Sequence, residues 1–134
     1  MGIFASLFGG APKRFISEKR FRTNVQTQTS MTPRTLAQLR QHGVSPSHLL
    51  KLEYFFYTDD PAKAAALAAA LKKLGYTAES GPSAGNSRVQ LVTGRTAPLP
   101  MVESALATWT EQMCQLGFDH DAEFDGWGTE VPKG

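Results

Sequence analysis

Residues 49–57 read LLKLEYFFY, and apolar side chains occupy every second position of this stretch. The even positions are Leu50, Leu52, Tyr54 and Phe56, whereas the odd positions mix charged and aromatic residues. Because successive side chains of a strand point to opposite faces of a sheet, this alternation predicts a strand with one face on a core. Its outer face would then carry Glu53, Phe55 and Tyr57.

Helical patterns and shorter strands flank this segment. The pair Thr32-Pro33 is a strong helix start, because threonine suits the N-cap and proline the first helical position, and Gly43 ends that helix. An alanine-rich helix is expected over 61–74, and a third helix over about 101–116 with Gly117 as its cap. Further strands are expected over 76–80, 88–93 and 118–124.

The order of these elements is a helix followed by β-α-β-β-α-β. This order predicts the α+β class: a ferredoxin-like antiparallel βαββαβ sheet with two helices on one face, preceded by a short extra N-terminal helix. Two similar joints support the prediction, since Leu74-Gly75-Tyr76 and Leu116-Gly117-Phe118 each end a helix and begin a strand.

Composition points to a soluble domain without a catalytic centre. The chain has 134 residues, of which 41% are hydrophobic and 19% charged. No apolar run approaches the roughly 18 to 20 residues of a membrane-spanning helix. A single cysteine, Cys114, excludes an internal disulfide and is expected to be a partly exposed thiol. The histidines are scattered and no glycine loop suits a phosphate, so we expect no enzyme, no cofactor and no metal.

The charge is divided unevenly along the chain. Residues 1–52 hold eight basic residues and one acid, Glu18, whereas residues 53–134 hold six basic residues and 11 acids. We therefore divide the chain into an apolar and basic leader, 1–30, poorly ordered or marginally structured, and a domain, 31–134. Within the leader, residues 23–30 would be a linker or a marginal edge strand.

The leader lacks the features of a signal peptide, which favours a cytoplasmic protein. Met1-Gly2 with Ser6 fits the loose myristoylation pattern, and apolar residues followed by basic ones could touch an anionic membrane weakly. Solvated charges on a poorly ordered terminus are the simpler interpretation.

The last expected strand carries several acids. Asp119, Asp121 and Glu123 would share one strand face, with Asp125 just beyond. Carboxylates in this pattern could bind a hard cation, but a strand spaces them about 6.8 Å apart. Solvated edge residues that discourage aggregation are a better interpretation, and an acidic docking surface is compatible with it.

Trp127 lies between two glycines, Gly126 and Gly128, which hold a large ring on an unusual backbone path. The ring could be a plug that closes the sheet edge or an exposed anchor for a protein partner. Phe55 and Tyr57 could in principle stack nucleic-acid bases, but the acids expected on the same face would repel phosphates. We therefore expect no direct contact with nucleic acid.

The stretch from Thr32 to Val131 resembles the RraB family, regulators described as protein inhibitors of ribonuclease E. The matching motifs are His42-Gly43 before Ser45-Pro46, Leu52-Glu53-Tyr54-Phe55-Phe56, Asp59-Asp60, Leu74-Gly75-Tyr76 and Glu123-Phe124-Asp125-Gly126-Trp127-Gly128-Thr129. The resemblance implies a non-enzymatic cytoplasmic module that binds another protein, the non-catalytic scaffold half of ribonuclease E, without touching RNA. This chain departs from the family in its slightly basic charge and in lacking a long acidic tail.

Two other roles compete with this one. A small acidic-faced domain could be an immunity-type protein that neutralises a toxin, or the leader could make the chain a membrane-surface adaptor through Ile3, Phe4, Leu7 and Phe8. For a protein partner, whether ribonuclease E, another nuclease or a toxin, the expected contact residues are Glu53, Phe55, Tyr57, Asp119, Asp121, Glu123, Asp125 and Trp127.

Overall fold

The computed structural model describes residues 14–132. Three helices lie in this part of the chain: α2 (Glu18–Gln41), α3 (Pro61–Lys73) and α4 (Glu103–Asp119). Its strands are β1 (Leu49–Leu50), β2 (Glu53–Thr58), β3 (Glu79–Pro82), β4 (Gln90–Arg95), β5 (Leu99–Pro100) and β6 (Glu123–Gly128).

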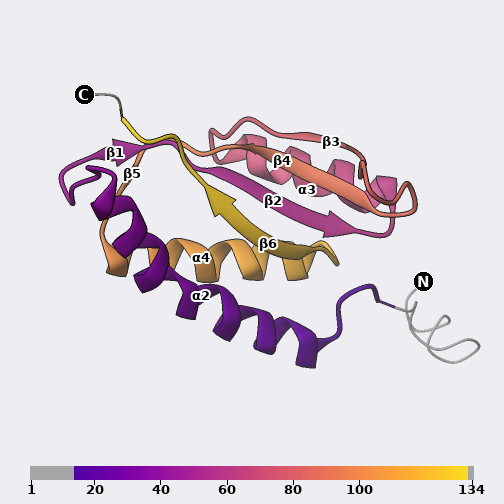
Figure 1. The fold of residues 1–134 in the computed structure, drawn as a ribbon. Coiled ribbons are helices and arrows are strands. Elements are labelled where there is room, and N and C mark those ends of the chain that lie inside the picture. The colour runs from indigo at the N-terminus through magenta and orange to yellow at the C-terminus, as the bar shows by residue number, and fades with distance from the viewer. Residues whose placement is uncertain (1–13, 133–134) are drawn as a thin grey trace, which may run out of the picture.

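The main sheet has four strands in the order β3-β4-β2-β6, and every neighbouring pair is antiparallel. A second sheet pairs β1 with β5. Helices α3 and α4 pack on one side of the main sheet, and α2 runs alongside α4 and the β6 edge (Figure 1). The predicted α+β class, the β-α-β-β-α-β order and the additional N-terminal helix are confirmed, and the strand order fits a ferredoxin-like arrangement.

The predicted alternation along the central strand is confirmed. Leu52, Tyr54 and Phe56 are completely buried, whereas Phe55 and Tyr57 stay partly exposed. Phe56 packs against Phe124 of β6, with ring centroids 5.4 Å apart. The apolar face of β2 is thus the centre of the core, and its position fixes which side chains face outward. The strand itself is shorter than predicted, because the chain leaves the regular strand between β1 and β2.

Helix α2 is much longer than predicted. It begins after Ser17, whose hydroxyl accepts a hydrogen bond from the N–H of Arg20 at 3.1 Å, so the predicted start at Thr32-Pro33 is wrong. The predicted linker or edge strand over 23–30 is wrong as well, and α2 runs through the expected boundary at residue 30.

Tertiary contacts explain why this polar stretch is helical. Phe21 and Val25 pack on the core, and the Asn24 side chain donates to the Phe124 carbonyl at 2.9 Å. These contacts hold the helix together although Pro33 removes one of its backbone hydrogen bonds. The myristoylation pattern and the apolar patch of the leader fall on residues 1–13, outside the described residues.

The junction between α4 and β6 also differs from the prediction. Gly117 does not end α4, which continues to Asp119, and the expected strand over 118–124 is replaced by a turn followed by β6. Gly117 serves close packing instead, because a Cβ there would lie 2.9 Å from the Ala122 carbonyl oxygen and 3.0 Å from the Phe56 ring. Asp121 makes the turn with a positive φ of 55°.

Cys114 is buried rather than partly exposed, so that expectation is wrong. Its burial raises the pKa of the thiol to about 12, and nearby Glu123 and Glu111 act in the same direction. The thiol is therefore a small core side chain and is protonated at neutral pH.

We predict that Gly94→Ala strongly destabilises the fold. Gly94 lies opposite Tyr54 in the β2–β4 pair, and a Cβ there would lie 1.9 Å from the Thr77 carbonyl oxygen and 2.6 Å from the Tyr54 hydroxyl. Relieving this overlap needs a backbone shift, which we expect to cost about 3 kcal/mol in the free energy of unfolding measured by urea denaturation. Gly81→Ala in β3 is the control, because a Cβ there meets nothing within 4 Å. Equal stability of the two variants would contradict this packing.

Candidate protein-binding surface

The outer face of β2 presents the two aromatic side chains Phe55 and Tyr57 beside Glu53. In the adjacent strand β4, Thr93 lies opposite Phe55 and Leu91 lies opposite Tyr57. Because α3 and α4 pack on the other side of the sheet, these side chains remain partly exposed (Figure 1). We call Glu53, Phe55, Tyr57, Leu91 and Thr93 the outer face.

On its other side, β2 pairs with β6 through an irregular register. Gly126 lies opposite Phe55, and the register shifts between Phe55 and Phe56. Gly126 has a φ of 125°, which side chains other than glycine rarely adopt. The flank of Phe55 toward β6 therefore has no side chain opposite it, and part of the aromatic ring stays accessible.

The acids expected to share a strand face are separated by the structure. Asp119 lies in the last turn of α4 and accepts a hydrogen bond from the Gln115 amide at 2.8 Å. Asp121 lies in the following turn, and Glu123 is the first residue of β6. The predicted shared face of Asp119, Asp121 and Glu123 is wrong, because the helix continues for two residues beyond Gly117.

Asp121 is buried and joins three parts of the fold. Its carboxylate accepts hydrogen bonds from the backbone N–H of Phe15 at 2.8 Å and of Ile16 at 2.9 Å, and from the Lys63 ammonium of α3 at 2.6 Å. Its own carbonyl accepts from the Thr58 hydroxyl at the end of β2, at 2.8 Å. Asp121 therefore fastens the N-terminal segment and α3 to the end of the central strand.

These contacts shift the protonation of Asp121. Burial alone would raise the pKa of the carboxyl, but the hydrogen bonds from Ile16, Lys63 and Phe15 outweigh it and lower the pKa below the usual value for aspartate. The side chain is therefore charged at neutral pH and held by internal partners.

Glu123 is paired within the fold, whereas Asp125 is exposed. Glu123 forms two hydrogen bonds with the Arg20 guanidinium, at 2.7 and 2.9 Å. This pairing raises the pKa of Arg20 and ties the start of α2 to β6. Asp125 is exposed at the irregular step of β6.

Trp127 packs against the core rather than projecting away from it. It lies opposite Tyr54 in the β2–β6 pair and meets Trp109 of α4 edge-on, with ring centroids 6.4 Å apart and planes at 82°. Its ring is partly buried. This geometry is that of the plug, the first of the two interpretations drawn from the sequence.

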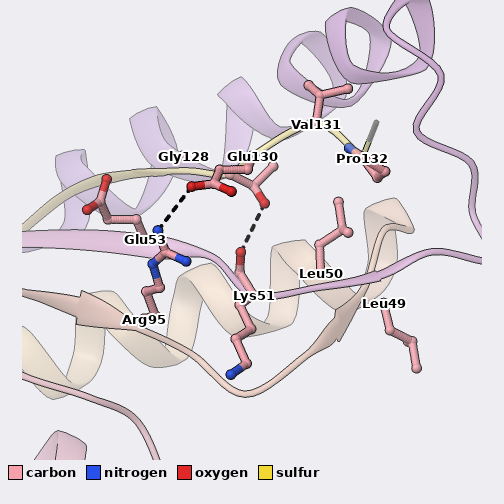
Figure 2. Close-up of a pocket in the computed structure, with 10 residues that line it drawn as sticks. Leu49, Leu50, Lys51, Glu53, Arg95, Gly128, Glu130, Val131 and Pro132 are labelled. Carbon is pink, nitrogen blue, oxygen red and sulfur yellow. Dashed lines mark hydrogen bonds and ion pairs between the residues drawn. The ribbon is translucent and has the colours of Figure 1, made fainter. Parts of the chain in front are cut away.

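Next to the outer face, a groove of about 630 Å³ opens between β1 and the segment after β6. One wall is formed by residues 49–51 and the other by residues 128–132, with Glu53 and Arg95 at the end nearest the outer face (Figure 2). Leu49 is 64% exposed and Val131 is 38% exposed. Apolar side chains are thus accessible beside the outer face.

Residues 14–132 contain no group of three histidine, cysteine or acidic side chains arranged to hold a metal ion. None of the helices described in this range has both the length and the apolar character needed to cross a bilayer. What the arrangement offers chemically is a partly apolar surface with charged margins, suited to binding another macromolecule.

Known proteins resemble this chain over most of its length. The family model described as Regulator of ribonuclease activity B, RraB, matches residues 29–129. This chain belongs to the RraB family. It is also 28% identical over 116 residues to the Regulator of ribonuclease activity B of Photobacterium profundum, covering 78% of this chain and 82% of that protein.

Within this RraB-family chain, the sequence pattern predicted the outward position of Glu53, Phe55 and Tyr57 but gave no indication of two features. The first is the role of Asp121, which depends on Phe15 and Ile16, more than 100 positions away. The alternating pattern of residues 118–124 also does not indicate that Asp121 has a positive φ. The groove is built from two segments separated by more than 70 residues, so no local pattern indicates it.

We predict that Asp121→Asn lowers the free energy of unfolding by about 2 to 3 kcal/mol at pH 7, because charge-assisted hydrogen bonds to buried partners are lost. Asparagine tolerates the positive φ, so the backbone is not a second cause. Asp119→Asn is the matched control, because Asp119 is exposed and accepts from the Gln115 side chain.

The stability difference between wild type and Asp121→Asn depends on pH. Because folding lowers the pKa of Asp121, its contribution is fully present above the unfolded aspartate pKa of about 3.9 and is lost as the pH falls through the lower folded value. The stability gap between wild type and Asp121→Asn, measured by urea denaturation, should therefore close in strong acid. A gap that is constant from pH 7 to pH 2 would contradict this assignment.

Proposed function

We propose that this chain regulates a ribonuclease by binding to it as a protein, without catalysing a reaction itself. The match to the RraB family over residues 29–129 carries this proposal. The relative from Photobacterium profundum is named as a regulator of ribonuclease activity, and the alignment spans most of both chains. We propose that the partner is the non-catalytic scaffold half of ribonuclease E and that binding takes place in the cytoplasm.

The outer face supports this proposal because it has the composition of a protein-binding patch. Two aromatic side chains, Phe55 and Tyr57, lie side by side on the central strand and are partly exposed. Aromatic residues are enriched at the centre of protein interfaces, and charged residues at the rim provide specificity. Glu53 and Asp125 are exposed acids suited to such a rim.

The remaining predicted contact residues divide by accessibility. Asp119 is exposed, but it is the last residue of α4, whereas the aromatic pair lies in β2. Asp121, Glu123 and Trp127 are engaged in contacts within the fold. We therefore place the partner contact on Glu53, Phe55, Tyr57 and Asp125, and assign Asp121, Glu123 and Trp127 to supporting that surface.

We predict that the double substitution Phe55→Ser and Tyr57→Ser weakens binding to purified ribonuclease E by at least about tenfold, because interface aromatics contribute strongly to affinity. Affinity is measured by biolayer interferometry against the full-length nuclease and against its scaffold half. The control is Leu74→Ser, which removes an apolar side chain that is 56% exposed at the end of α3, on the other side of the sheet.

Urea denaturation must show that the double variant is folded. Wild type should also slow RNA cleavage by the nuclease, and the double variant should not. Absence of binding by wild type would overturn the proposed function. Equal affinity of wild type and the folded double variant would move the contact away from the outer face.

A further inference from the structure

The free edge of β1 faces the groove beside the outer face. Within the small sheet, the N–H of Met101 donates to the His48 carbonyl at 3.2 Å, and further along the N–H of Thr96 donates to the Leu52 carbonyl at 2.9 Å. Backbone groups of an extended chain alternate in direction, so those of Leu49 and Lys51 point to the opposite side. That side is the groove.

The pairing of β2 with β6 stops just before this edge. Its last pair is Glu53 with Gly128, and one step further the Thr129 hydroxyl donates to the Lys51 carbonyl at 2.9 Å. The side chain thus replaces the backbone hydrogen bond that would continue the sheet. Beyond Thr129 the chain diverges from β1, and the groove opens between the two segments (Figure 2).

The walls of the groove combine backbone groups with apolar side chains. Leu50 lies near Val131 and Pro132 across the opening (Figure 2). Leu49 and Val131 are exposed although both are apolar. An open strand edge beside exposed apolar side chains is the arrangement by which proteins add an extended peptide as a further strand.

The charges at the groove favour a basic side chain in the peptide. The Arg95 guanidinium is paired with Glu130 at 3.2 Å, and the Lys51 ammonium points away from that pair (Figure 2). Glu53 belongs to both the groove and the outer face and lies opposite Arg95 in the β2–β4 pair. Because Arg95 pairs with Glu130, Glu53 has no ion pair within residues 14–132. A lysine or arginine of the peptide would pair with this carboxylate.

We propose that an extended segment of the protein partner binds this groove as a strand added to the edge of β1. Its backbone pairs with Leu49 and with the N–H of Lys51, because the Lys51 carbonyl already accepts from Thr129. An apolar side chain of the segment packs against Leu50 and Val131, and a basic side chain pairs with Glu53. That the partner is a ribonuclease rests on the proposed function. The binding mode itself rests on the open edge, the exposed apolar side chains and the charge of Glu53.

The probe for this mode is the peptide acetyl-Val-Arg-Val-Arg-Val-amide, titrated into isotope-labelled full-length protein and followed by the amide signals in NMR spectra. We expect saturable shifts at Leu49, Lys51, Glu130 and Val131. The same peptide with every backbone nitrogen methylated cannot donate hydrogen bonds, and the Val-Glu-Val-Glu-Val analogue has the wrong charge. Both should bind at least about tenfold more weakly, because the methylated peptide loses the backbone hydrogen bonds and the glutamate peptide loses the charge complementarity with Glu53. Equal binding of all three peptides would overturn the proposal.

Two variants of one residue separate the backbone from the side chain. Lys51→Pro removes the N–H that faces the groove, whereas Lys51→Ala removes the same side chain and keeps the N–H. We expect Lys51→Pro to weaken the peptide at least about fivefold relative to Lys51→Ala, and Glu53→Gln to weaken it by about threefold with a smaller salt dependence. Equal affinity of the proline and alanine variants would overturn strand addition. If the proline variant does not fold, the methylated peptide makes the same comparison.

Binding of the same variants to ribonuclease E distinguishes the two proposals. Peptide binding without nuclease binding would overturn the proposed function and support the groove. If the nuclease binds the proline and alanine variants equally strongly, the proposal of strand addition in the groove is overturned, and the proposed function stands. Sedimentation of the protein alone gives the third outcome: a dimer disrupted by Lys51→Pro but not by Lys51→Ala would show that a second copy occupies the edge, which would also overturn binding of a partner segment.

Discussion

The carboxylate of Asp121 is the interaction on which the arrangement of this domain depends. It lies in the tight turn between α4 and β6, where it binds the N–H groups of Phe15 and Ile16 and the ammonium of Lys63. The turn thereby holds the entrance of α2, the first part of α3 and the end of β2 in fixed positions. A buried carboxylate is favourable only when donors surround it, and here the N-terminal segment and α3 supply them, while Thr58 of β2 donates to the backbone carbonyl of Asp121. Strand β6 begins two residues after Asp121, so this turn sets where the strand starts beside β2.

The sequence was informative where the burial of a side chain depends on its close neighbours. The alternation from Leu50 to Phe56 predicted the central strand and its inner face, and the alanine-rich stretch 61–74 predicted α3. It was misleading where distant contacts decide the local structure. The polar residues 23–30 are helical because Asn24 contacts residues 90 and 100 positions away and Val25 packs against the core, and no local pattern contains that information.

The candidate site shows the same division. The outward position of Phe55 and Tyr57 follows from period-two alternation, whereas the acids after α4 could be placed correctly only once the helix end was known. A glycine at position 117 is consistent with either a helix cap or close packing against a neighbouring side chain. The structure shows close packing, because the Phe56 ring leaves no room for a Cβ there. One misplaced helix end moved Asp121 from an interior position to an apparent surface, and it made three separated acids look like one charged face.

The uneven charge along the chain acquires a different meaning in the folded protein. Excluding Lys13 and Lys133, residues 14–132 contain twelve basic and twelve acidic residues, so the described part is neutral. Arg14 and Arg20 from the basic half pair with Asp121 and Glu123 from the acidic half. The charges in these two pairs connect segments that fold together, and they are therefore not available to steer a partner. Only two exposed acids, Glu53 and Asp125, accompany the aromatic pair. The binding that we propose at this surface would therefore depend on apolar contact and backbone pairing more than on overall charge.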